Sequence, residues 1–61
     1  MSDDERRRME REAVAYWLIV QGLMALFDAK GYLDNGEWHE LEVNRDELDK
    51  RNNILGLPKV D

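Results

Sequence analysis

The chain has no cysteine, one histidine and one proline among its 61 residues. Without cysteine it cannot form a disulfide, and a structural zinc site, which takes four cysteine or histidine ligands, is not expected. Small domains without these supports usually gain stability by oligomerisation or by docking on a larger protein. We therefore expect one domain over residues 1–61, no cofactor, and a need for a partner.

Basic residues are also in the minority, with nine Lys and Arg against 14 Asp and Glu and a net charge of −5. This balance disfavours direct binding to nucleic acid, whose phosphates are negative. No signal peptide is expected, because a mixed-charge segment precedes the apolar run, and the predicted location is the cytoplasm. That run covers about 15 residues, with Gln21 and Gly22 in its middle, whereas a bilayer core requires roughly 20, so a membrane span is not expected.

A capping motif and a glycine delimit the first predicted helix, over about residues 3–30. Ser2 and the glutamate three residues later can form a capping box at its start. Gly31 suits the left-handed position that follows a helix, and Tyr32 can fold back onto Phe27 as the apolar contact of a Schellman ending. The turn is expected at residues 31–34.

The second half admits more than one interpretation. Asn35-Gly36 between apolar flanks favours a β-hairpin at 32–43 as the alternative, and a shorter helix capped near Asn44 would leave 34–43 as a loose turn. A helix over about residues 35–55 is preferred, because Asp34 begins a second capping box. One helical stripe also joins Trp38, Leu41, Arg45, Leu48, Asn52 and Leu55. Gly56 ends this helix and begins the tail 56–61, in which Val60 is a possible apolar latch.

The first helix carries more apolar surface than the second can cover. The predicted hairpin core consists of Met9, Ala13, Tyr16, Val20, Leu23, Phe27, Trp38, Leu41, Leu48 and Leu55. A further set of apolar and small residues remains for another chain: Ala15, Trp17, Leu18, Ile19, Gly22, Met24 and Leu26. An uncovered patch of that size is rare on soluble monomers. The predicted fold is thus an all-α helical hairpin that completes a four-helix bundle by homodimerisation.

Candidate chemistry is sparse. His39 with Glu42 is the only candidate acid–base or metal pair, and a solvated histidine beside acids is the preferred interpretation. The segment from Asp28 to Gly36 fails the spacing of a calcium loop. No catalytic, cofactor-binding or metal site is predicted, and the chain is not expected to be an enzyme.

The charged segments are expected to be solvated. The N-terminal arginines can pair within the helix, as Asp4 with Arg8 and Arg7 with Glu10. The predicted function is that of an oligomerising interaction protein, such as an adaptor, regulator or accessory subunit, whose partner is itself or a larger protein. The alternative is an acidic inhibitor of a phage-like kind, whose second helix blocks a basic nucleic-acid-binding site on a partner.

Overall fold

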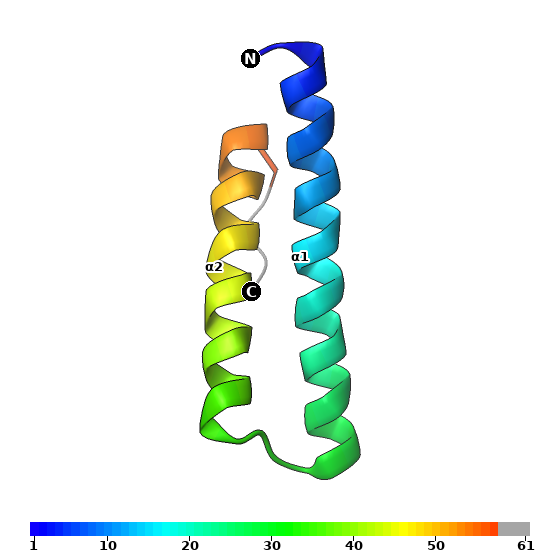
Figure 1. Cartoon of the computed structure of the whole chain (residues 1–61), viewed down its shortest axis with the longest axis vertical. Helices are drawn as coiled ribbons and strands as arrows, with labels where there is room; N and C mark the ends of the chain where they lie inside the picture. Colours follow the sequence, from blue (N-terminus) through cyan, green and yellow to red (C-terminus); the bar gives the residue numbers. More distant parts are fainter. Residues whose placement is uncertain (58–61) are drawn as a thin grey trace.

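Two antiparallel helices form the molecule, in a computed structural model that describes residues 1–57 (Figure 1). Helix α1 spans Asp3–Lys30 and helix α2 spans Asn35–Leu55. The two helices contact each other along the length of α2, and the principal dimensions are 42 × 17 × 14 Å. The predicted all-α helical hairpin is confirmed.

The two ends of α1 are closed by local hydrogen bonds. The Ser2 hydroxyl accepts a hydrogen bond from the backbone N–H of Glu5, which satisfies one of the unpaired donors of the first turn. Gly31 adopts a left-handed conformation with φ 81°, and its N–H donates to the Phe27 carbonyl at 2.7 Å. This single bond is the simpler αL ending and not the predicted Schellman ending. Tyr32 is exposed, and the centroid of its ring lies 4.6 Å from the Lys30 ammonium, within the range of a cation–π contact.

Helix α2 begins with the predicted capping box. The Asp34 carboxylate accepts from the Glu37 N–H at 2.8 Å, and the Glu37 carboxylate accepts from the Asp34 N–H at 3.1 Å. Two N-terminal donors are thereby satisfied, which favours helix over a two-residue hairpin turn. The structure places residues 35–43 in α2, so the alternative β-hairpin and the loose turn are both wrong.

The end of α2 is a full Schellman motif. Gly56 has φ 77°, and its N–H donates to the carbonyls of Asn52 and Asn53. The Leu57 N–H donates to the Asn52 carbonyl at 2.7 Å, which turns the chain back toward the helices. The predicted latch through Val60 lies outside the described residues.

The core between the helices consists of two small clusters. Toward the open end of the hairpin, Met9 and Tyr16 pack against the buried Ala13, Leu48 and Leu55. Near the turn, the buried residues are Val20, Leu33 and Leu41, with Leu23 and Leu26 packed against them. Leu48 is the most completely buried side chain, at 2 % exposure. Both clusters lie on one side of α1, so its opposite side receives no cover from α2.

Candidate interaction surface

One edge of the seam between the helices is closed by Arg51. Its guanidinium carbon lies 4.5 Å from the centroid of the Tyr16 ring. Nη1 donates to the Glu47 carboxylate at 2.6 Å, and Nε lies 3.5 Å from the Glu12 carboxylate. The hydrogen bond to Glu47 raises the pKa of Arg51, and the same bond lowers the pKa of Glu47. This edge is therefore a polar seal with its own charge partners.

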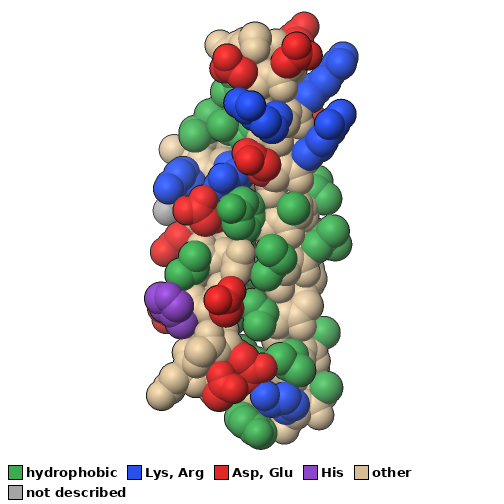
Figure 2. Space-filling view, in the orientation of Figure 1, with side chains coloured by type: hydrophobic (Ala, Val, Ile, Leu, Met, Phe, Trp, Pro, Cys, Tyr) green, Lys and Arg blue, Asp and Glu red, His purple; other side chains and the backbone are tan. Residues whose placement is uncertain are grey.

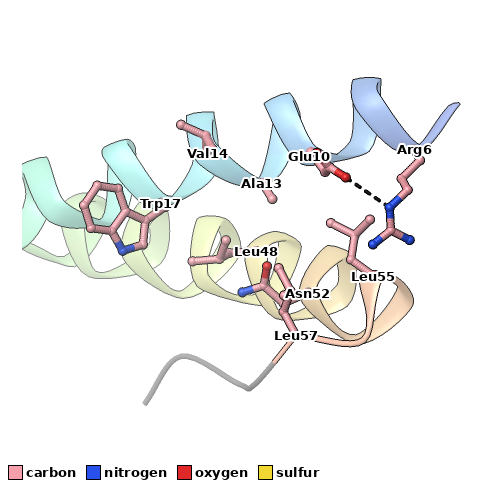
Figure 3. Close-up of a pocket in the computed structure, with 9 residues that line it drawn as sticks. All are labelled: Arg6, Glu10, Ala13, Val14, Trp17, Leu48, Asn52, Leu55 and Leu57. Carbon is pink, nitrogen blue, oxygen red and sulfur yellow. Dashed lines mark ion pairs between the residues drawn. The ribbon is translucent and has the colours of Figure 1, made fainter. Parts of the chain in front are cut away.

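The other edge of the seam is an open apolar groove of about 420 Å³ (Figure 3). Helix geometry explains the contrast, because consecutive residues point about 100° apart, so Tyr16 and Trp17 flank the seam on opposite edges. An ion pair of 3.1 Å between Arg6 and Glu10 lies at one end of the groove, and Trp17 lies at the other. The groove is lined by Arg6, Glu10, Ala13, Val14, Trp17, Leu48, Asn52, Leu55 and Leu57.

A charged clasp and an aromatic pair hold the turn end of the hairpin. The Lys30 ammonium donates to the Glu37 carboxylate at 2.7 Å. This bond raises the pKa of Lys30 and lowers that of Glu37, whose carboxylate also accepts the Asp34 N–H. The Phe27 and Trp38 rings are 6.1 Å apart and tilted by 59°, a favourable aromatic geometry. Both were predicted in the hairpin core, but both are exposed, because they lie at the rim where the helices end.

The part of α1 that α2 leaves uncovered is strongly apolar and open to solvent. We call this surface the outer face; its large residues are Val14, Trp17, Leu18, Ile19 and Met24, all exposed. Leu18 leaves 57 % of its surface accessible. Hydrophobic side chains follow α1 down the molecule in Figure 2, and the outer face joins the apolar groove through Val14 and Trp17. Exposed apolar surface of this kind is typical of interaction sites.

Most residues predicted for an oligomer interface lie on this exposed side of the helix. Ala15, Trp17, Leu18, Ile19, Gly22 and Met24 are all exposed. Leu26 differs, because it is half-buried and packs against the cluster of Val20, Leu33 and Leu41. A side chain on Gly22 would meet nothing within 4 Å, so packing within this chain does not require the glycine.

Leu33 is a core residue that the sequence pattern did not reveal. It stands in the turn between the helices, where helical periodicity does not apply, yet it is only 7 % exposed. Two asparagines of α2, Asn44 and Asn52, are buried as well. The Asn44 amide donates to the Glu40 carbonyl at 2.7 Å, which satisfies it locally.

Helix α1 also meets the length and composition of a membrane-spanning helix. An 18-residue window within it has a mean hydropathy of 1.3, and 11 % of that window is buried inside the hairpin. The expectation that this segment is too short to cross a bilayer was based on the length of the apolar run alone, whereas the whole helix has 28 residues. A core helix of a soluble protein passes the same test, so this property alone is weak evidence.

Few charged residues in the described part of the chain are arranged in a way that could support catalysis or metal binding. Within residues 1–57 no group of three or more His, Asp or Glu side chains could hold a metal ion, and His39 is exposed. Among the N-terminal arginines, the pair that forms is Arg6 with Glu10. The expected pairs of Asp4 with Arg8 and of Arg7 with Glu10 are not among the ion pairs of the described chain.

Comparison with known proteins gives no significant match: no family model, no curated protein and no solved structure is similar to the chain. The function is therefore inferred from the geometry of the hairpin.

Proposed function

We propose that the protein is a non-enzymatic interaction protein, an adaptor, regulator or accessory subunit, that self-associates through α1. The observation that carries this proposal is the exposed outer face, where five large apolar side chains lie along one helix. A second copy is the partner that the composition favours, because it offers the same apolar surface to an isologous contact. Two hairpins would then form a four-helix assembly with both α1 helices at its centre.

The small core of the hairpin supports the same proposal. Its buried apolar residues are Ala13, Val20, Leu33, Leu41, Leu48 and Leu55, and only Leu48 approaches complete burial. Ordering a residue costs about 1.5 kcal/mol, so a chain of this size needs extensive apolar burial to fold. Covering the outer face adds burial that α2 does not provide.

The alternative of an acidic inhibitor has less support from the geometry. Two of the α2 carboxylates are already engaged, since Glu37 binds Lys30 and Glu47 binds Arg51. Arg45 lies in a hollow on the surface of α2 that Glu42 and Asp46 also line. These internal cations weaken the field that α2 could present to a basic site.

Sedimentation equilibrium at micromolar concentration tests self-association. We expect at least twice the monomer mass for the natural chain and a shift toward monomer for Leu18→Glu, which places a charge in the contact. Val43→Glu is the matched control, because it adds the same charge at an exposed apolar position of α2. A natural chain that stays monomeric, with a stable helical circular dichroism spectrum, would contradict the proposal.

Vesicle flotation separates this proposal from membrane association. The assembled protein should remain in solution with vesicles of neutral or anionic lipid, because its apolar face is covered by the second copy. Quantitative flotation together with a monomeric mass in detergent would instead support the spanning or surface-bound helix that the hydropathy of α1 permits.

A further inference from the structure

The outer side of α1 carries a heptad pattern with a charged residue near each end. Leu18, in its middle, lies about 200° around the helix from the buried Val20, so this pattern faces away from α2. Its members follow alternating steps of four and three residues, the spacing of a coiled-coil seam. All seven are exposed, and we call them the heptad seam: Arg7, Arg11, Val14, Leu18, Gln21, Ala25 and Asp28.

The charges of the heptad seam favour one direction of pairing. Arg7, Arg11 and Asp28 make no ion pair within the described residues 1–57, so they are available to another chain. A parallel pair of α1 helices would place Arg11 beside Arg11 and Asp28 beside Asp28. An antiparallel pair places Arg11 beside Asp28 at both ends of the contact. Between facing side chains opposite charges attract and like charges repel, so antiparallel pairing is more stable than parallel pairing.

We infer, on the basis of the proposed function, that two copies pair through α1 in antiparallel direction with Arg11 of each chain opposite Asp28 of the other. Two residues of the heptad seam that face each other across the contact then have numbers that sum to 39. The same register places Val14 opposite Ala25 and Leu18 opposite Gln21. In antiparallel coiled coils each layer joins the two kinds of seam position, and this register satisfies that condition in each layer between Arg11 and Asp28. Arg7 lies opposite position 32, beyond the end of α1, and has no partner within the seam.

The flanks of the heptad seam agree with this register. Trp17 of one copy lies near Met24 of the second on one side, so two large exposed side chains cover each other. Ala15 lies near Gly22 on the other side, where the helix backbones approach closely and no side chain is needed. The polar Gln21 lies close to the two-fold axis, a position at which one polar residue fixes coiled-coil register.

The overall charge distribution also favours antiparallel pairing. The turn end of the hairpin is acidic, with five acids and one lysine between residues 28 and 42. Parallel pairing would bring two such ends together. Antiparallel pairing places them at opposite ends of the contact, because Asp28 of each chain then lies beside Arg11 of the other, about 26 Å along the helix from the second Asp28 at about 1.5 Å per residue. This separation exceeds the Debye length of about 8 Å at physiological salt, so their repulsion is screened.

Disulfide trapping tests the register directly, because the natural chain has no cysteine. Val14→Cys and Ala25→Cys chains are oxidised separately and as an equimolar mixture, and the products are identified by mass spectrometry. We expect the mixture to give mainly the mixed disulfide and each variant alone to give little covalent dimer. The two positions are 11 residues apart, about 16 Å along the helix, which no disulfide spans. Efficient dimerisation of each variant alone would overturn the inference in favour of parallel pairing.

Charge exchange provides an independent test with its own control. Arg11→Asp and Asp28→Arg chains should each associate at least about tenfold more weakly than the natural chain, because each homodimer then has like charges at both contacts. Their equimolar mixture should regain the natural association constant, since every contact in the heterodimer again joins opposite charges. Arg45→Asp makes the same change of charge on α2 and should leave association unchanged.

The outcomes separate this inference from the proposed function. The register is wrong if the natural chain is dimeric but charge exchange does not change its association constant. It is also wrong if disulfide trapping shows parallel pairing. In both cases the proposal of self-association still holds. A monomeric natural chain overturns both. Circular dichroism at 222 nm confirms that each variant retains its helices, and the trapping experiment stands if a charge variant unfolds.

Discussion

The guanidinium of Arg51 lies 4.5 Å from the centroid of the Tyr16 ring and closes one edge of the seam between the helices. With only 16 % of its side chain exposed, Arg51 contributes its methylene groups as well as its charge to this edge. The opposite edge has no comparable cover and is the apolar groove. The hairpin is therefore asymmetric, with one edge of the seam closed by Arg51 and the other left as an open apolar groove.

Arg51→Ala should destabilise the hairpin by about 1–2 kcal/mol, because it removes the cation–π contact and two partly screened ion pairs. Urea unfolding followed by circular dichroism at fixed protein concentration measures the change. Arg45→Ala controls for the helix propensity of alanine, since Arg45 is exposed on the same helix. An equal effect of the two substitutions would show that the Tyr16 contact is not stabilising.

Leu48→Ala should cost about 2–5 kcal/mol, because it leaves a cavity beside Ala13 and Leu55 in the centre of a small core. For a 61-residue chain this loss is large enough to unfold a major fraction of the molecules at 25 °C. Leu18→Ala deletes the same atoms at an exposed site and should preserve helicity while it weakens association. Thermal melts and sedimentation of the two variants together distinguish folding from assembly.

Glu37→Gln should remove a pH-dependent part of the stability. The Lys30 and Asp34 hydrogen bonds lower the pKa of Glu37 below its ordinary value of 4.5, so the folded state favours the ionised form. The resulting stabilisation is complete above about pH 4.5 and is lost as the pH falls through the lowered pKa. The melting temperatures of the natural chain and of Glu37→Gln should therefore differ at neutral pH and converge in acid. Glu42→Gln is the control on the same helix.

Gly22 separates helix stability from close approach of a second chain. Gly22→Ala should stabilise α1 by about 1 kcal/mol, because alanine has the higher helix propensity and its methyl group meets open space within the hairpin. Gly22→Leu should weaken association, because a branched side chain cannot enter the contact with Ala15 of the second copy. Equal mass and melting temperature for the leucine variant would count against that contact.

The helices were predictable because strong local signals mark their ends. The capping box at Asp34 marks the start of α2, and the glycines at 31 and 56 mark the ends of α1 and α2. These signals can be recognised without knowing how the helices pack. Helical periodicity likewise indicated the buried positions in the middle of both helices, such as Val20 and Leu41. These features depend on neighbours within a few residues along the chain.

The rest depended on where the first helix ends and the second begins, and on how the turn folds. Phe27 and Trp38 follow the core periodicity but lie at the rim, where no further turn of helix covers them. Leu33 is buried because the turn passes beneath the helices, which no periodicity indicates. Helical spacing alone predicted Leu26 at the oligomer interface. In the structure Leu26 packs against Val20, Leu33 and Leu41, because the turn brings Leu33 into this cluster. The open groove could not be predicted from the sequence, because residue spacing does not show that the Arg51 side chain covers only one edge of the seam between the helices.

The position of the two tryptophans gives the protein a built-in optical reporter. Each leaves 44 % of its surface accessible, but Trp17 borders the groove on the outer face whereas Trp38 packs beside Phe27 at the turn. Burial of Trp17 in a new contact shifts its fluorescence emission to shorter wavelength, and Trp38 records the integrity of the turn. A Trp38→Phe chain would thus signal assembly in dilute solution without an attached dye.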